Sequence, residues 1–126
     1  MSLKQLVVSS ETVAEEALGG ALRGLVSVLD GSGDIMPTSE FSTLDNALKV
    51  LAYLLAIRAT VILGYKKHAY ATAEDVATAL GLDVQRTREC LSRLKPKYLD
   101  RTEEGYGVPF TRVLAACEEL SKRRSK

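Results

Sequence analysis

The strongest constraint in this sequence is a pair of short helical patterns separated by three residues. Thr72 stands where an N-cap hydroxyl is favoured, and residues 73–80 follow with two acidic side chains in the first turn, where the helix dipole stabilises them. Gly81 supplies the positive φ that ends a helix, and Asp83 caps a second helix over residues 84–95. A helix, a short turn with glycine and another helix make the helix-turn-helix spacing.

The second of these helices has one apolar face and one polar face. A rotation of about 100° per residue separates the two sets of side chains. The inner set is Val84, Thr87, Leu91 and Leu94, the outer set is Gln85, Arg86, Glu89 and Arg93, and Arg88 and Ser92 lie on one flank. Pro96 ends the helix because its ring cannot be accommodated in a further turn.

Downstream of this helix, the pattern predicts a short two-stranded ribbon and a last helix. Residues 98–102 and 106–108 read as strands around a turn at 103–105. An amphipathic helix follows, with its apolar stripe at Phe110, Val113, Leu114, Cys117 and Leu120. Residues 121–126 are expected to form a basic C-terminal tail.

Upstream lies a helix over residues 44–66 that is apolar on nearly every side. Lys49 and Arg58 interrupt it, and no uninterrupted apolar run approaches the roughly 20 residues that a bilayer requires, so no membrane partner is expected. A helix that is apolar all round is buried all round, so either the N-terminal helix, a second subunit or both must cover it. The residues expected at a homodimer interface are Leu51, Leu54, Leu55, Ile57 and Ile62.

Residues 1–43 are interpreted as a helical N-terminal extension and a further dimerisation element. Apolar spacing predicts a helix from Glu11 to Leu29, followed by a loop from Gly31 to Ser39. Glycines at 19, 20 and 24 weaken this helix. They indicate either the close approach of a partner helix or a bend near residues 19–20.

Composition indicates the number of domains, the charge distribution and the expected cellular compartment of the protein. Its 126 residues, of which 46% are hydrophobic and 26% charged, fit one globular domain. The net charge of +1 hides an asymmetry, because residues 1–64 sum to −3 and residues 65–126 to +4. An anionic partner would therefore bind the second half. Two cysteines and no pattern of a signal peptide lead us to expect a cytoplasmic protein.

This order of elements resembles the winged-helix DNA-binding domain of small archaeal and bacterial transcription regulators. The residues that carry the resemblance are 72–82, the Thr87–Arg88 pair with Leu91 and Leu94, and the pairs Tyr98–Leu99 and Gly105–Tyr106. The resemblance covers residues 44–120. It implies a mainly α fold with a small β-wing, here a winged helix-turn-helix with extra N-terminal helices.

The resemblance also implies a binding mode, in which the second helix enters the major groove of double-stranded DNA and the appended helices build a homodimer. The groove-facing residues are then Gln85, Arg86, Arg88, Glu89 and Arg93, and the residues near phosphates are Lys95, Lys97 and Arg101. This sequence departs from the family in two places. Thr87 occupies a position that is normally aliphatic, and Glu103 and Glu104 place negative charge at the tip of the wing.

These features predict a DNA-binding transcription regulator or chromatin-associated protein. The alternative is a winged-helix protein-interaction module that does not bind DNA, although such a module is expected to have an apolar outer face on residues 84–95. A third hypothesis is a regulator that binds an effector between the long apolar helices. The sequence shows no polar residue that would identify such an effector.

No catalytic, cofactor or metal site is predicted. Cys90 and Cys117 do not have the spacing of metal ligands and are expected to be buried thiols. His68 has no identifiable nucleophile beside it and is expected at a solvent-exposed helix end. The glycines at 31 and 33 follow a helix instead of a strand, which argues against a phosphate-binding loop.

Overall fold

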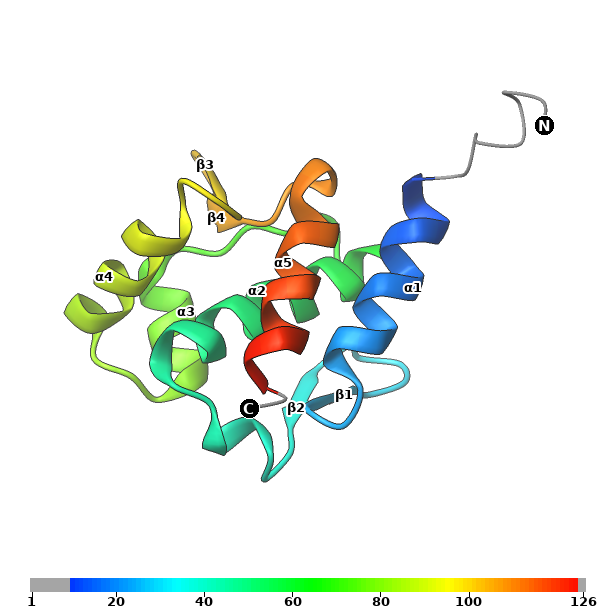
Figure 1. Cartoon of the computed structure of the whole chain (residues 1–126), viewed down its shortest axis with the longest axis horizontal. Helices are drawn as coiled ribbons and strands as arrows, with labels where there is room; N and C mark the ends of the chain where they lie inside the picture. Colours follow the sequence, from blue (N-terminus) through cyan, green and yellow to red (C-terminus); the bar gives the residue numbers. More distant parts are fainter. Residues whose placement is uncertain (1–9, 125–126) are drawn as a thin grey trace.

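The computed structural model describes residues 10–124 (Figure 1), so the parts of the predicted N-terminal extension and basic tail at residues 1–9 and 125–126 lie outside it. The described chain is mainly helical, with two small pairs of antiparallel strands, which confirms the predicted mainly α class with a small β component. The elements are α1 (Ser10–Leu22), β1 (Val26–Val28), β2 (Ile35–Pro37), a 3-10 turn (Phe41–Thr43), α2 (Asn46–Ile62), α3 (Ala73–Leu80), α4 (Val84–Leu94), β3 (Asp100–Thr102), β4 (Gly105–Gly107) and α5 (Phe110–Arg124).

The predicted apolar helix is α2, and it forms the centre of the molecule. It contacts α1 and α5 on one side and α3 and α4 on the other (Figure 1). Asp45 caps it by accepting a hydrogen bond from the Leu48 amide at 2.9 Å, so the helix begins slightly later than predicted. The cover that an apolar helix requires comes from four other helices of the same chain. Within residues 10–124, no helix has the length and apolar character needed to cross a membrane.

The first helix is shorter than predicted. It ends at Leu22, and Gly24, with φ +82°, turns the chain into β1. The prediction that this helix extends to Leu29 is therefore wrong. Gly19 and Gly20 remain helical with open space beside them, so the described chain shows neither the predicted bend nor a closely packed helix at these glycines.

The segment predicted as a loop is instead the turn and second strand of a hairpin. Val28 pairs with Ile35 in the antiparallel β1–β2 register. Gly33, with φ +74°, packs directly against the Tyr65 side chain, where a Cβ would clash. The Tyr65 hydroxyl donates a hydrogen bond to Asp30 Oδ1 at 2.8 Å. These contacts attach the tip of the hairpin to the segment that follows α2.

The α3–turn–α4 unit forms as predicted. Thr72 Oγ1 accepts from the Asp75 amide at 3.1 Å, and Gly81 ends α3 with φ 67°. Asp83 Oδ1 accepts from the first amides of α4, at 2.7 Å from Gln85. Thr87 is fully buried, and its hydroxyl donates to the Asp83 carbonyl at 2.9 Å, which explains how a polar residue occupies a core position of this unit.

The predicted ribbon is the β3–β4 pair, and it is attached to the segment before α3. The backbone groups of Ala71 and Tyr106 exchange two hydrogen bonds, at 2.9 and 2.8 Å. Gly107 lies against Ala69, where a Cβ would come within 2.5 Å of the Ala69 carbonyl oxygen. Ala71 thus joins the ribbon through a single antiparallel bridge to Tyr106.

The last helix, α5, differs from the prediction in its buried face and its length. Phe110 and Leu114 are 42% and 51% exposed, so two members of the predicted apolar stripe face solvent. The buried face comprises Val113, Ala116, Cys117 and Leu120. The helix continues to residue 124, which corrects the prediction that a tail begins at residue 121.

The N-terminal extension does not form a separate core. Leu18 and Leu22 of α1 belong to one hydrophobic cluster with Leu51 of α2 and Leu120 of α5. The predicted boundary at residue 43 therefore does not divide the fold into two separately packed units.

Candidate nucleic-acid interface

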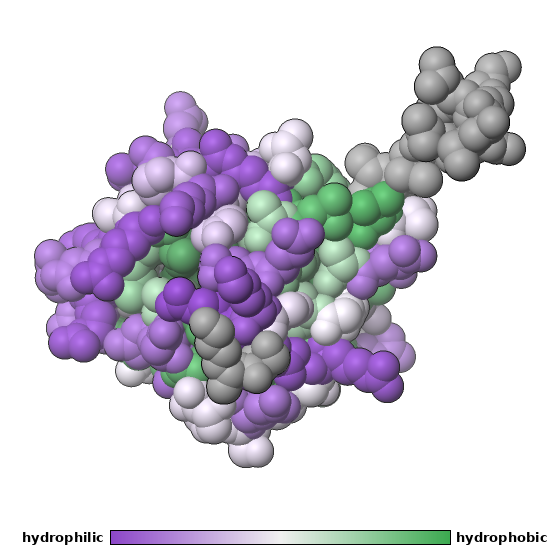
Figure 2. All heavy atoms as spheres, in the orientation of Figure 1, coloured by the Kyte–Doolittle hydropathy of each residue, from purple (hydrophilic) through white to green (hydrophobic). Residues whose placement is uncertain are grey.

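The outer face of α4 is exposed along its whole length. All five residues predicted to face the groove, Gln85, Arg86, Arg88, Glu89 and Arg93, are exposed. The opposite face is buried through Thr87, Cys90, Leu91 and Leu94. The surface around α4, at the left of Figure 2, is strongly hydrophilic. This helix therefore presents a polar face that the protein core does not use.

The cations on this face differ in their partners. Arg88 pairs with Glu74 of α3, and the backbone amide of Glu74 together with this guanidinium lowers the pKa of the Glu74 carboxyl. The guanidinium groups of Arg86 and Arg93 make no hydrogen bond or ion pair with residues 10–124. Two guanidinium groups of α4 thus remain available for an external anion, while Arg88 is held beside a carboxylate.

The residues predicted near phosphates surround the end of α4. Lys95 and Lys97 are exposed in the turn after the helix. Arg101 of β3 lies over the Tyr106 ring, 5.3 Å from its centroid. The structure thus brings Lys95 and Lys97 next to the α4 face and places Arg101 on the ribbon, where its guanidinium stacks on an aromatic ring.

Arg112 of α5 positions this turn, a role that sequence reasoning missed. Its Nη1 donates to the Lys95 carbonyl at 3.1 Å and also to the Leu99 carbonyl. The sequence gives no signal for this role, because the residues that meet are at least 13 positions apart. Arg112 therefore fixes the turn that carries the two predicted phosphate-contacting lysines.

The tip of the ribbon keeps its negative character. Glu103 is exposed, and the Glu104 carboxylate lies 3.3 Å from His68 Nδ1. His68 is exposed as predicted, but it lies in the segment between α2 and α3 and not at a helix end. The tip is consequently a poor surface for phosphate compared with the α4 face.

Arg58 is a second residue whose role the sequence did not reveal. It is buried in α2, its Nε donates to the Val108 carbonyl at 3.0 Å, and its guanidinium lies 4.5 Å from the centroid of the Phe110 ring. Burial lowers the pKa of Arg58, against the opposing influence of Tyr70 and Asp100. Arg58 thus joins the central helix to the chain between the ribbon and α5, and its stacking accounts for the outward position of Phe110.

Three of the five residues predicted at a dimer interface are not at the surface. Leu51, Leu54 and Leu55 have no exposed area, because α2 is covered within the chain. The prediction that they contact a second copy is therefore wrong. Ile57 and Ile62 are partly buried and line two different cavities, one beside α3 and one beside α1.

The two cysteines are buried free thiols, as predicted. Burial raises the pKa of Cys117 to about 11 and also raises the pKa of Cys90. Both thiols are therefore protonated at neutral pH. Residues 10–124 contain no cluster of three histidine, cysteine or acidic side chains arranged to hold a metal ion.

Comparison with known protein families, curated proteins and solved structures finds no match for this chain. The resemblance to winged-helix domains therefore rests on the sequence pattern alone. The support for a function of the α4 face therefore comes from the charge and exposure of the residues on that face.

Proposed function

We propose that this protein binds double-stranded DNA through α4, as a transcription regulator or chromatin-associated protein, with residues 44–120 acting as a winged-helix domain. The observation that carries the proposal is an exposed polar helix face on which the guanidinium groups of Arg86 and Arg93 have no hydrogen bond or ion pair within the described chain. An arginine can bond guanine in a bidentate way, and Gln85 offers the amide that suits adenine.

The dimensions of α4 support this role. A helix with its side chains is about 10–12 Å in diameter, and the major groove of B-DNA is about 12 Å wide, so a helix such as α4 can lie in the groove. Asp83 fixes the N-terminal turn, which is the part of a recognition helix that reaches base edges. The lysines at 95 and 97 would then lie beside phosphates, where they contribute affinity but not sequence preference.

The proposal assigns DNA contact to α4 and the turn after it, and leaves the tip of the ribbon off the duplex. Glu103 and Glu104 would be repelled by phosphate, and the distance from Glu104 to His68 is short enough for this carboxylate to be engaged within the protein. Arg101, stacked on Tyr106, is the ribbon residue that carries positive charge toward solvent.

The proposed complex contains two copies of the chain, because dimeric helix-turn-helix proteins place two such helices on half-sites about one helical turn apart. The support lies in an apolar groove of about 380 Å³ between α1, β1 and the end of α2. Leu63 lines it and is 53% exposed. Sedimentation of the wild type and of Leu63→Glu would test this part of the proposal, since the charged variant should sediment as a monomer.

The decisive experiment is a fluorescence-anisotropy titration of a labelled random duplex at about 50 and 200 mM salt. We expect binding that weakens with salt and weakens again by about tenfold or more in the Arg86→Ala/Arg93→Ala variant. Lys67→Ala, which removes an exposed cation away from α4, the turn after it and the proposed dimer groove, is the control and should bind like the wild type. Absence of binding at the lower salt concentration would reject the proposal and leave α4 as a surface for a protein partner.

A further inference from the structure

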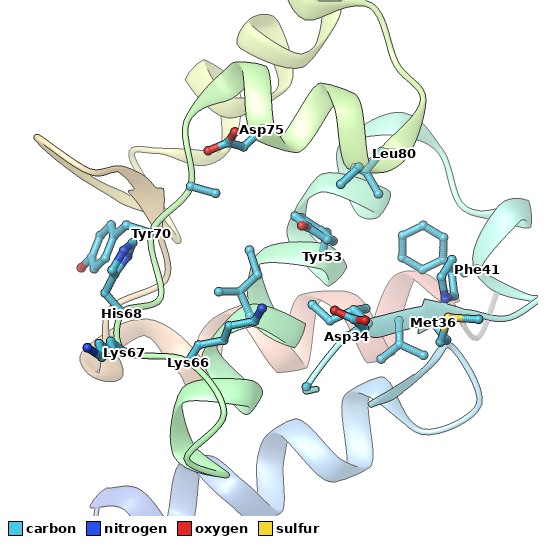
Figure 3. A pocket seen from close by; sticks show the side chains of 17 residues that line it. Asp34, Met36, Phe41, Tyr53, Lys66, Lys67, His68, Tyr70, Asp75 and Leu80 are labelled. Carbon is cyan, nitrogen blue, oxygen red and sulfur yellow. The ribbon is translucent and has the colours of Figure 1, made fainter. Parts of the chain in front are cut away.

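A second site lies on the side of α3 that faces the β1–β2 hairpin. A cavity of about 780 Å³, partly open to solvent, is lined by α2, α3, the hairpin and the segment between α2 and α3 (Figure 3). Its apolar walls come from Ile35, Phe41, Tyr53, Ile57 and Leu80. The volume lies within the range of roughly 300–1,000 Å³ that is typical of small-molecule sites.

The walls of this cavity are fixed by contacts within the chain. Gly33 packs on Tyr65, and Tyr65 bonds Asp30, so the tip of the hairpin is attached to the segment after α2. At the other end of the hairpin, the Thr38 hydroxyl donates to the Gly24 carbonyl at 2.6 Å. The space is therefore present before any ligand enters, which lowers the entropic cost of binding.

Two polar groups that lack partners reach this space. The Lys66 side chain extends into it below Tyr53 (Figure 3), and its ammonium makes no hydrogen bond or ion pair with residues 10–124. The Tyr53 hydroxyl has no hydrogen bond within the same residues. Burial, with a further effect of Asp75, raises the pKa of Tyr53, so this hydroxyl stays protonated and can donate. Together they form two donors for a carboxylate.

The facing wall supplies the opposite charge. Asp34, in the turn of the hairpin, lies across the cavity from Lys66 (Figure 3), and no ion pair joins these two side chains. Lys67 points away from the cavity, although it is the next residue in the chain. With Lys67 directed away, Lys66 stands against the aspartates at 34 and 75, so the charge of the lining does not favour a net anion.

We propose that this cavity binds a small zwitterion with a large apolar side chain, of which the hydrophobic α-amino acids are the simplest members. The carboxylate accepts hydrogen bonds from Lys66 and Tyr53, and the ammonium group pairs with Asp34. The apolar side chain lies against Phe41 and Leu80. The proposal does not depend on DNA binding, because every group involved lies away from the outer face of α4.

The first test compares three compounds by isothermal titration calorimetry on the full chain without DNA. L-phenylalanine carries both charges, 3-phenylpropionate lacks the ammonium group and 2-phenylethylamine lacks the carboxylate. We expect phenylalanine to bind and each analogue to bind about tenfold more weakly, as for the loss of one charge-assisted interaction. No binding of phenylalanine, or equal binding of all three compounds, would overturn the proposal.

The second test uses matched variants of the lining. Lys66→Ala should weaken phenylalanine binding by about tenfold, whereas Lys67→Ala should change it by less than about twofold. Asp34→Asn should weaken the binding of phenylalanine but not that of 3-phenylpropionate. These exposed positions leave the core intact, and a thermal melt of each variant verifies folding. An equal loss in Lys66→Ala and Lys67→Ala would place the ligand elsewhere and reject the site.

Discussion

Arg124 donates a hydrogen bond from Nη1 to the backbone carbonyl of Ala21 at 2.8 Å, and so joins the last turn of α5 to the last turn of α1 across 103 positions of sequence. Its Nη2 lies 3.3 Å from Glu40, just before the 3-10 turn. A residue predicted to belong to a basic tail therefore holds three parts of the fold together.

Replacement of Arg124 should destabilise the protein. Arg124→Ala removes a partly buried charge-assisted hydrogen bond, and we expect a loss of about 1–3 kcal/mol in the free energy of unfolding, measured in urea. Arg123→Ala is the control, since Arg123 is exposed and its two ion pairs, at 3.8 and 3.9 Å, are long. Equal stability of the two variants would show that the Ala21 contact contributes nothing.

The burial of α2 makes a second prediction. Leu54→Ala should lower the free energy of unfolding by about 2–5 kcal/mol, because it opens a cavity inside a packed core. Leu114→Ala removes the same group at an exposed position of α5 and should change stability by less than about 0.5 kcal/mol. A destabilisation by Leu54→Ala that disappears at high protein concentration would instead indicate a dimer contact.

Thr87 gives a prediction of the opposite sign. Its hydroxyl donates to the Asp83 carbonyl, which already accepts the backbone hydrogen bond of the Thr87 amide at 2.9 Å. Thr87→Val therefore leaves no polar group without a partner, and we expect a change within about 0.5 kcal/mol or a gain in stability. Thr87→Ala, which leaves a small void, should destabilise. Chemical denaturation of both variants checks the order.

Burial of Cys117 makes stability depend on pH in the alkaline range. The folded pKa of about 11 lies above the ordinary thiol pKa of 9.0, so the unfolded chain releases this proton first. Stability is then fully present below pH 9 and falls as pH rises from 9 to 11, by at most about 3 kcal/mol from this group. Cys117→Ala should show a shallower decline than the wild type in urea titrations across this interval.

Two substitutions that change charge in opposite directions test whether DNA contacts the turn after α4 or the tip of the ribbon. Lys97→Glu should weaken duplex binding and reduce its salt dependence, because a phosphate contact becomes a repulsion. Glu103→Lys should change the affinity by less than about twofold at 200 mM salt, where a charge off the duplex is screened. Anisotropy titrations of both variants measure this contrast, and a marked gain with Glu103→Lys would place the tip on the DNA.

The parts of the fold that were predicted correctly depend on local signals. Thr72, Gly81 and Asp83 act on amides or dihedral angles within a few residues of themselves, so they can be interpreted without knowing the rest of the chain. The exposed face of α4 follows from helical periodicity for the same reason. The winged-helix identity and DNA binding remain proposals.

The parts that were missed depend on residues far apart in sequence. Leu25 and Leu29 continue a helical spacing, but the chain leaves the helix because the hairpin packs Gly33 on Tyr65, more than 30 positions away. Phe110 fits an apolar stripe, yet it faces outward and stacks on Arg58. A local sequence pattern cannot indicate contacts between residues this far apart in the chain.

The same distinction holds for the two candidate sites. Sequence periodicity identifies the cations on α4 but not that Arg88 pairs with Glu74, because the two residues come from separate helices. For the proposed ligand cavity, the sequence pattern did not indicate which polar residues would hold an effector. Lys66 and Asp34 lie 32 positions apart in the sequence, and only the folded hairpin brings them to one cavity.

The two glycines of the ribbon lie against the backbone of residues 69–71, with no room for a side chain between them. Thr72 follows directly and caps α3, so the main-chain contacts of the ribbon continue into the first turn of this helix. The orientation of the ribbon relative to the α3–α4 pair is therefore set by backbone groups and by the absence of two side chains.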